Sequence, residues 1–131
     1  MYKLLIAGDE RVVTRVIACT EPVYVSTIAV EEFVAFYMNV INKARAPRTE
    51  LSLPRAHADF AEAIESIGSL SPFAYSNAAH KVYQTFSAKT LRVGAQDCRI
   101  AAQAIAHGMT VITRNLRDFD AIGAPCADWS E

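Results

Sequence analysis

The feature of the sequence that most constrains the fold is the alternation of short apolar runs with longer segments of helical periodicity. Residues 23–28 and 109–113 are rich in β-branched side chains and predict two buried strands. Alternation of this kind favours an α/β fold, in which helices cover both faces of a mostly parallel sheet. The expected helices cover residues 9–19 and 30–44, a segment from Ser52 to about residue 67, a segment after Ser76, and a segment between residues 97 and 107.

Local signals mark where these helices begin and end. Ser52 and Ser76 are suitable N-caps, and Pro54 is in the first turn, where proline costs little. Gly68 and Gly108 follow the last apolar residues of two helices and predict their C-terminal ends. Residues 69–73 are expected to be extended, residues 91–97 to form a loop, and residues 114–120 to form a polar turn.

Length and charge exclude several classes of protein. A chain of 131 residues favours a single domain over residues 1–131, and 52% hydrophobic residues are enough for a core. Thirteen basic and fourteen acidic residues leave a net charge of −1, which excludes a general electrostatic attraction to nucleic acid or anionic membranes. No apolar run approaches the roughly 18 residues of a membrane span, and the N-terminal apolar run is too short for a secretory signal.

The cysteines and histidines give no sign of a disulfide framework or a zinc site. Cys19, Cys98 and Cys126 are odd in number and far apart, which fits a reducing cytoplasm. The three histidines lack the paired spacing of metal ligands.

Three acidic residues follow expected strands or begin expected helices. Glu32 is expected in the first turn of the helix after the first strand, Asp97 at the start of a later helix, and Asp118 five residues after Thr113. Each also has an ordinary explanation, as a helix cap, a solvated residue or a turn residue. Together, however, they would meet at the carboxyl edge of a parallel sheet. Clustered carboxylates of this kind suit Mg²⁺ or Mn²⁺, which can activate water against a phosphodiester.

Three segments, in this order, resemble motifs of the PIN-domain family, and most closely those of the VapC toxins of bacterial toxin–antitoxin pairs. Residues 26–33 (STIAVEEF) resemble the second motif, in which the acid precedes a large apolar residue. Residues 93–104 (VGAQDCRIAAQA) resemble the third motif and residues 111–119 (VITRNLRDF) the fourth. Residues 71–73 and 128–129 also match, so the resemblance covers nearly the whole chain.

The resemblance implies a three-layer α/β/α sandwich and a metal-dependent endoribonuclease that cleaves RNA. It further implies a cytoplasmic homodimer, inhibited by a cognate antitoxin protein. Glu32, Asp97 and Asp118 match the family's later acids, and would be both catalytic residues and ligands of Mg²⁺ or Mn²⁺. Thr113 and Asn115 match polar positions that support them. The neighbouring Glu31 is expected to point away from Glu32.

The sequence departs from the family at its N-terminus, where a strand normally ends in the first acid of an Asp-Thr-Asn-like motif. In one alignment residues 2–7 are that strand and Asp9 is a displaced first acid. In the other, which we favour at this stage, residues 4–12 resemble the end of the first helix and the loop after it. The chain would then lack one strand's worth of sequence: either the start codon is misplaced, or residues 1–7 or a partner chain fill the gap. Loss of one carboxylate would also weaken metal binding and make the chain a poor nuclease.

Two alternatives stand beside the nuclease. A catalytically impaired PIN-like module would keep antitoxin binding or dimerisation, and the departure at the N-terminus favours it. A small α/β protein that binds a phosphate-containing ligand is disfavoured because no glycine-rich loop follows a strand. A basic cluster of four residues is more typical of a solvated helix end than of an RNA-binding surface. Its members are Lys43, Arg45, Arg48 and Arg55.

Overall fold

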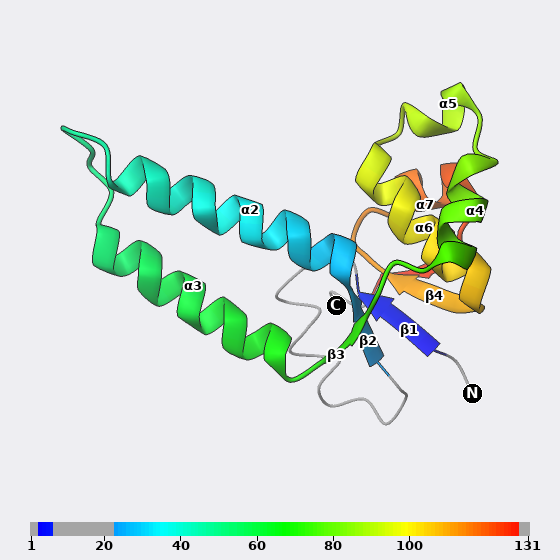
Figure 1. Cartoon of the computed structure of the whole chain (residues 1–131), viewed down its shortest axis with the longest axis horizontal. Helices are drawn as coiled ribbons and strands as arrows, with labels where there is room; N and C mark the ends of the chain where they lie inside the picture. The colour runs from blue at the N-terminus through cyan, green and yellow to red at the C-terminus, as the bar shows by residue number, and fades with distance from the viewer. Residues whose placement is uncertain (1–2, 7–22, 129–131) are drawn as a thin grey trace.

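The computed structural model describes residues 3–6 and 23–128 (Figure 1). The centre of the described part is a parallel sheet of five strands. The strand order is β3-β2-β1-β4-β5, and every pairing is parallel. Parallel pairing places all carboxyl ends at one edge of the sheet. The predicted three-layer α/β fold with a mostly parallel sheet is confirmed. The strands are β1 (Lys3–Ile6), β2 (Val23–Ser26), β3 (Ser71–Phe73), β4 (Met109–Ile112) and β5 (Cys126–Ala127).

Strand β1 corrects the favoured interpretation of the N-terminus. It lies in the middle of the sheet, where Leu4 is in register with Val23 of β2 and Ile6 with Ile112 of β4. Residues 4–6 are therefore a strand and not the end of a helix, and the expected gap in the sheet is filled. A run of three apolar residues is too short for its periodicity to distinguish a strand from a helix end. The pairing with β2 and β4 shows that it is a strand. Asp9 and the helix predicted over residues 9–19 lie outside the described residues.

Six helices connect and cover the described strands. The predicted caps are confirmed: Ser52 Oγ accepts a hydrogen bond from Arg55 N at 3.2 Å, and Ser76 Oγ accepts one from Ala79 N at 3.1 Å. Gly108 ends α6 with a φ of 62°, a left-handed conformation that favours glycine. The helices are α2 (Thr27–Ala44), α3 (Leu53–Gly68), α4 (Asn77–Gln84), α5 (Ala88–Leu91), α6 (Ala95–His107) and α7 (Leu116–Ile122).

The structure differs from expectation near each predicted acid. The loop predicted over residues 91–97 is shorter, since α5 ends at Leu91 and α6 begins at Ala95. The strand predicted over residues 23–28 is β2, and it ends at Ser26. The Ser26 hydroxyl accepts a hydrogen bond from Ile28 N at 3.1 Å and caps α2, which begins at Thr27. The polar turn predicted over residues 114–120 is wrong, since α7 covers most of it. Phe119 and Ile122 of α7 are three residues apart and both buried, and this spacing is the signal of a short helix.

Among the residues whose burial the structure describes, a main core and a second, separate cluster can be distinguished. The main one joins the sheet to α6 and α7, and its members include Val25, Ile100, Val111 and Phe119. The second lies between α2 and α3 and contains Ile41, Ala44 and Ala56. Figure 1 shows why they are separate: α2 and α3 run side by side as a long helical hairpin that projects away from the sheet. None of the described helices has the length and apolar character needed to cross a membrane.

Candidate functional site

The three predicted acids follow strands or begin helices at the carboxyl edge of the sheet. Asp97 is the third residue of α6, and Asp118 is the third residue of α7, the helix that follows β4. Glu32 was expected in the first turn of its helix. It is the sixth residue of α2 and therefore lies in the second turn. The shift follows from the earlier start of α2 at Thr27.

Electrostatic repulsion connects the three acids. Burial raises the pKa of Glu32, and the negative charge of Asp97 raises this pKa further, with a smaller contribution from Glu31. Burial also raises the pKa of Asp97, and the charge of Asp118 adds to the effect. Asp97 therefore connects the other two acids, since its charge acts on Glu32 and the charge of Asp118 acts on Asp97. A cation placed among them would relieve this repulsion.

The two predicted supporting residues lie beside Asp118. Asn115 Nδ2 donates a hydrogen bond to Asp118 Oδ2 at 2.7 Å, and Asn115 N donates one to Thr113 Oγ1 at 2.9 Å. Thr113 is buried directly after β4, so its hydroxyl ties the loop to the end of the strand. The two contacts hold the Asp118 carboxylate by a short chain of hydrogen bonds that begins in the core.

A buried glutamine missed by the sequence analysis joins three elements beneath the acids. Gln103 of α6 and Ser26 are both fully buried, and the Ser26 hydroxyl donates a hydrogen bond to Gln103 Oε1. Gln103 Nε2 in turn donates to the Phe73 carbonyl oxygen at 3.2 Å. This network fixes the start of α2 and the end of β3 against α6. Its signal in the sequence is an amide among the apolar residues 100–105.

A second set of residues missed by the sequence analysis lies at the surface beside the acids. Gln96 Nε2 donates a hydrogen bond to Glu31 Oε1 at 2.8 Å, which joins α6 to α2. Arg99 Nη1 donates to Gln96 Oε1 at 2.6 Å, and Arg99 Cζ lies 4.9 Å from the centre of the Tyr83 ring of α4. Glu31 thus has a partner of its own, as its predicted orientation away from Glu32 allows. Nothing in the periodicity predicted which residue that partner would be.

The donor chemistry of the acids fits a hard divalent cation. Within residues 3–6 and 23–128, no group of three or more His, Cys, Asp and Glu side chains lies close enough to hold a metal ion. Mg²⁺, however, commonly binds proteins through one or two carboxylates and keeps several waters. Glu32 and Asp97, or Asp97 and Asp118, therefore meet the chemical requirement without a complete shell of protein ligands.

The comparison with family models decides the classification. A PIN domain model matches residues 3–125 of the chain. The chain belongs to the PIN domain family. The resemblance noted in three separate motifs is confirmed, and the match includes strand β1 and all three candidate acids. No curated protein sequence matches the chain significantly.

Solved structures similar to this PIN domain share its fold over nearly its whole length. VapBC from Salmonella typhimurium, bound to DNA, has a TM-score of 0.63 and 23% identity, covering 98% of this chain and 99% of that one. VapBC2 from Rickettsia felis, bound to a promoter DNA fragment, has a TM-score of 0.62 and 16% identity, with coverage of 98% and 99%. FitAcB from Neisseria gonorrhoeae has a TM-score of 0.61 and 24% identity, with 96% of each chain covered. These likenesses establish the fold.

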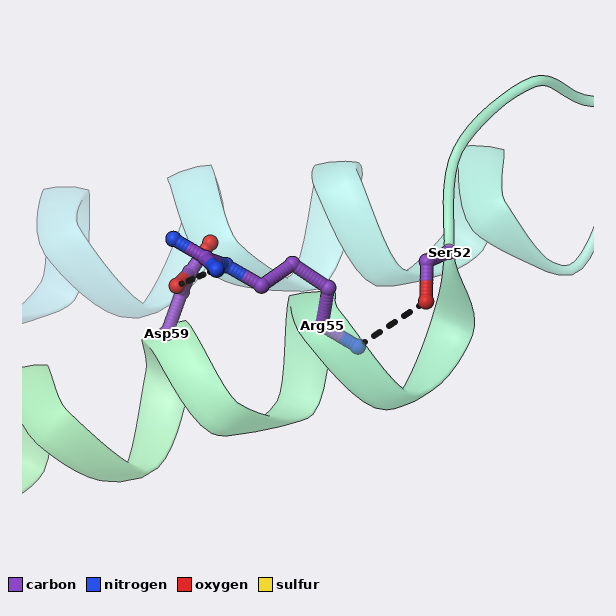
Figure 2. A network of polar contacts seen from close by, with 3 residues as sticks. All are labelled: Ser52, Arg55 and Asp59. Carbon is purple, nitrogen blue, oxygen red and sulfur yellow. Dashed lines mark hydrogen bonds and ion pairs between the residues drawn. The ribbon is translucent and has the colours of Figure 1, made fainter.

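The basic cluster is remote from the acids of the PIN domain. Lys43 lies at the opposite end of α2 from Glu32, about 16 Å away along the helix axis at 1.5 Å per residue. Arg55 lies in the first turn of α3, where its backbone N donates to the Ser52 cap, and its Nε donates to Asp59 Oδ1 at 3.0 Å (Figure 2). This placement agrees with solvated helix ends at the tip of the hairpin.

The hairpin also carries a groove. Its volume is about 480 Å³, and Phe36 and Tyr37 of α2 face Asp59 and Glu62 of α3 across it. The Tyr37 ring of α2 stacks on the Phe60 ring of α3, with centroids 5.4 Å apart, and this contact packs the two helices against each other beside the groove. The groove is separate from the acids and combines an apolar side with an acidic side.

Proposed function

We propose that this PIN domain is a metal-dependent endoribonuclease, the toxin of a toxin–antitoxin pair, which hydrolyses phosphodiester bonds of RNA. The observation that carries the proposal is the electrostatic coupling of Glu32, Asp97 and Asp118 at the carboxyl edge of the parallel sheet. Membership of the PIN family and the fold shared with VapBC proteins support it.

The proposed cation is Mg²⁺ or Mn²⁺, and its candidate ligands are Glu32, Asp97 and Asp118. A pair of them, Glu32 with Asp97 or Asp97 with Asp118, would hold it together with several waters. When bound, it neutralises the carboxylates and supplies the charge that activates a water and stabilises the phosphodiester transition state. Asn115 keeps the Asp118 carboxylate oriented, and Thr113 anchors Asn115 to the strand end. A chain with a net charge of −1 has no general attraction for RNA, so neutralisation of the acids would precede its binding.

The proposed partners are a cognate antitoxin protein and a second copy of the chain. Exposed large apolar side chains gather on the helical hairpin, where Phe36 and Ile64 are each more than half exposed. Clustered apolar surface of this kind marks protein–protein contacts. The proposed location is the cytoplasm, which agrees with Cys98 and Cys126 being free thiols.

The test is cleavage of single-stranded RNA in the presence of Mg²⁺ or Mn²⁺, with Asp97→Asn as the variant. Asparagine keeps the shape of the side chain and removes the charge that the cation requires, so we expect cleavage to fall at least a hundredfold. The matched control is Glu65→Gln, an exposed acid of α3 away from the site. Cleavage by Asp97→Asn at the rate of the unmodified chain would overturn the proposal.

A PIN module without catalytic activity is the second candidate. The observation in its favour is that no three-ligand group lies within the described residues. A calorimetric titration with Mn²⁺ separates the two candidates. Binding that is lost in Asp97→Asn supports the nuclease, whereas no binding that depends on Asp97 supports the inactive module.

A further inference from the structure

We propose that Glu31 and Gln96 are positioning residues, whose hydrogen bond holds Glu32 and Asp97 at a separation that allows both to bind one cation. The inference rests on the proposed function and assigns a role to two residues that neither the motifs nor the family match singled out. It is carried by contacts between side chains of α2, α6 and α4.

The first observation is where the hydrogen bond lies. Gln96 Nε2 donates to Glu31 Oε1 at 2.8 Å, although the two residues are 65 positions apart in the chain. Each partner directly precedes a candidate acid, Glu32 on α2 and Asp97 on α6. Successive helical residues point about 100° apart, so Glu31 can bind Gln96 while Glu32 stays available to a ligand. The bond therefore joins the two helices at the level of the acids.

The second observation is that the Gln96 amide has only one suitable orientation. Arg99 Nη1 donates to Gln96 Oε1 at 2.6 Å, and a guanidinium group has no acceptor atom. The amide oxygen must therefore face Arg99, which leaves the NH₂ group for Glu31. Arg99 itself rests on the Tyr83 ring, with Cζ 4.9 Å from its centre. The Glu31 carboxylate is thus connected through Gln96 and Arg99 to α4.

The third observation is that the acids need an external constraint. Glu32 and Asp97 directly follow the two residues joined by the 2.8 Å hydrogen bond, and two carboxylates held near each other repel unless a cation lies between them. The buried contact between Ser26 and Gln103 holds the base of α2 against α6. The contact between Glu31 and Gln96 is the corresponding link at the surface. Partners that orient metal ligands typically contribute 10- to 100-fold to metal affinity.

The experiment is a calorimetric titration with Mn²⁺ of the unmodified chain, Gln96→Glu, and the double variant Glu31→Gln/Gln96→Glu. Gln96→Glu places two carboxylates against each other and breaks the bond, so we expect Mn²⁺ affinity to fall about tenfold or more. The double variant reverses donor and acceptor, rebuilds the bond and leaves net charge unchanged. We expect it to recover most of the lost affinity.

The controls separate positioning from charge and from folding. Gln84→Glu adds the same charge to an exposed glutamine of α4 and should leave Mn²⁺ affinity unchanged. Thermal unfolding of each variant verifies that the fold is kept. Added charge alone would strengthen Mn²⁺ binding, so equal or tighter binding by Gln96→Glu overturns the inference. Failure of the double variant to recover affinity also overturns it.

These outcomes are distinct from failure of the proposed function. If the unmodified chain binds no Mn²⁺ in a manner that depends on Asp97, the nuclease proposal and this inference both fall. If it does bind, and the Gln96 variants bind equally well, only the positioning role of Glu31 and Gln96 is rejected.

Discussion

Helix α6 buries most of its apolar side chains, whereas helix α3 of the hairpin leaves many of its own exposed. The buried residues of α6 include every position from Ile100 to Ala104, because α6 packs against the sheet and α4. Helix α3 is longer, yet its buried residues are the alanines Ala56 and Ala63. The hairpin therefore exposes side chains that α6 would bury, and Figure 1 shows it projecting away from the sheet.

The difference separates two tasks. Asp97 stands on the first turn of a helix that the core holds in place on several sides, as a site built from repelling carboxylates requires. The hairpin has only its own small core and an exposed surface that includes Phe36 and Ile64. Such a surface is suited to binding another protein. Side chains that stay exposed bury little apolar area and therefore contribute little to stability.

The largest effect that tests this comparison is expected from the same substitution in the two regions. Ile100 of α6 is 2% exposed, and Ile100→Ala should lower the free energy of unfolding by about 2–5 kcal/mol. Ile64 of α3 is 53% exposed, and Ile64→Ala should change it by about 0.5 kcal/mol or less. Urea unfolding of both variants measures the difference. Equal losses would show that the hairpin is as well packed as α6.

The next effect concerns the buried amide of α6. Gln103→Leu keeps a similar side-chain volume but leaves Ser26 Oγ and the Phe73 carbonyl without their partner. We expect the free energy of unfolding to fall by about 1–3 kcal/mol. Gln84→Leu, at an exposed position of α4, is the control and should have a much smaller effect. An unchanged urea midpoint for Gln103→Leu would contradict the proposed role of the network.

Glycines at the ends of the two helices should respond in opposite directions. Gly108 ends α6 with a φ of 62°, so Gly108→Ala should cost about 1–2 kcal/mol of stability. Gly68 is the last residue of α3, and a Cβ there would meet no atom within 4 Å. Gly68→Ala should therefore increase stability by about 0.4–1 kcal/mol. A shift of the melting temperature in the same direction for both variants would refute this assignment.

A smaller effect, which depends on pH, is expected at Asp97. Its pKa is raised in the folded protein, so the folded state binds the proton more tightly than the unfolded state does. The stability contributed by the protonated form is present below the ordinary Asp pKa of about 3.9 and is lost as pH rises through the folded value. In EDTA, Asp97→Asn should therefore stabilise the protein at pH 7 more than at low pH. A gain that does not vary with pH would contradict this.

The smallest effect is expected from the ion pair on the hairpin. Arg55 and Asp59 are four residues apart on the exposed face of α3 and meet at 3.0 Å (Figure 2). Exposed pairs of this kind contribute about 0.2–0.5 kcal/mol and are screened by salt. Asp59→Asn should lower the melting temperature only slightly at low salt and not at all in 1 M NaCl. A loss that persists at high salt would mean that Asp59 has another role.

Local sequence patterns were sufficient for much of the fold and for the residues of the candidate site. The serine caps, the terminal Gly108 and the β-branched runs all act on residues close to them in the chain. For the same reason they predicted α3, α6 and β4 closely, and they placed Asp97 at a helix start. Helix α7 was missed because its apolar stripe is short and lies between charged residues.

Long-range contacts decided the rest, since residues far apart in the chain make them. Residues 4–6 became the central strand because β2 and β4 both pair with them, and no local pattern of three apolar residues requires that. The contact of Gln96 with Glu31 spans 65 positions and could not be predicted from spacing. The sequence by itself determined the candidate acids, the helical character of segments such as α3 and α6, and the serine caps of α3 and α4. Only the tertiary structure decided that Glu32, Asp97 and Asp118 interact, because strand order and helix packing are set by contacts between distant segments.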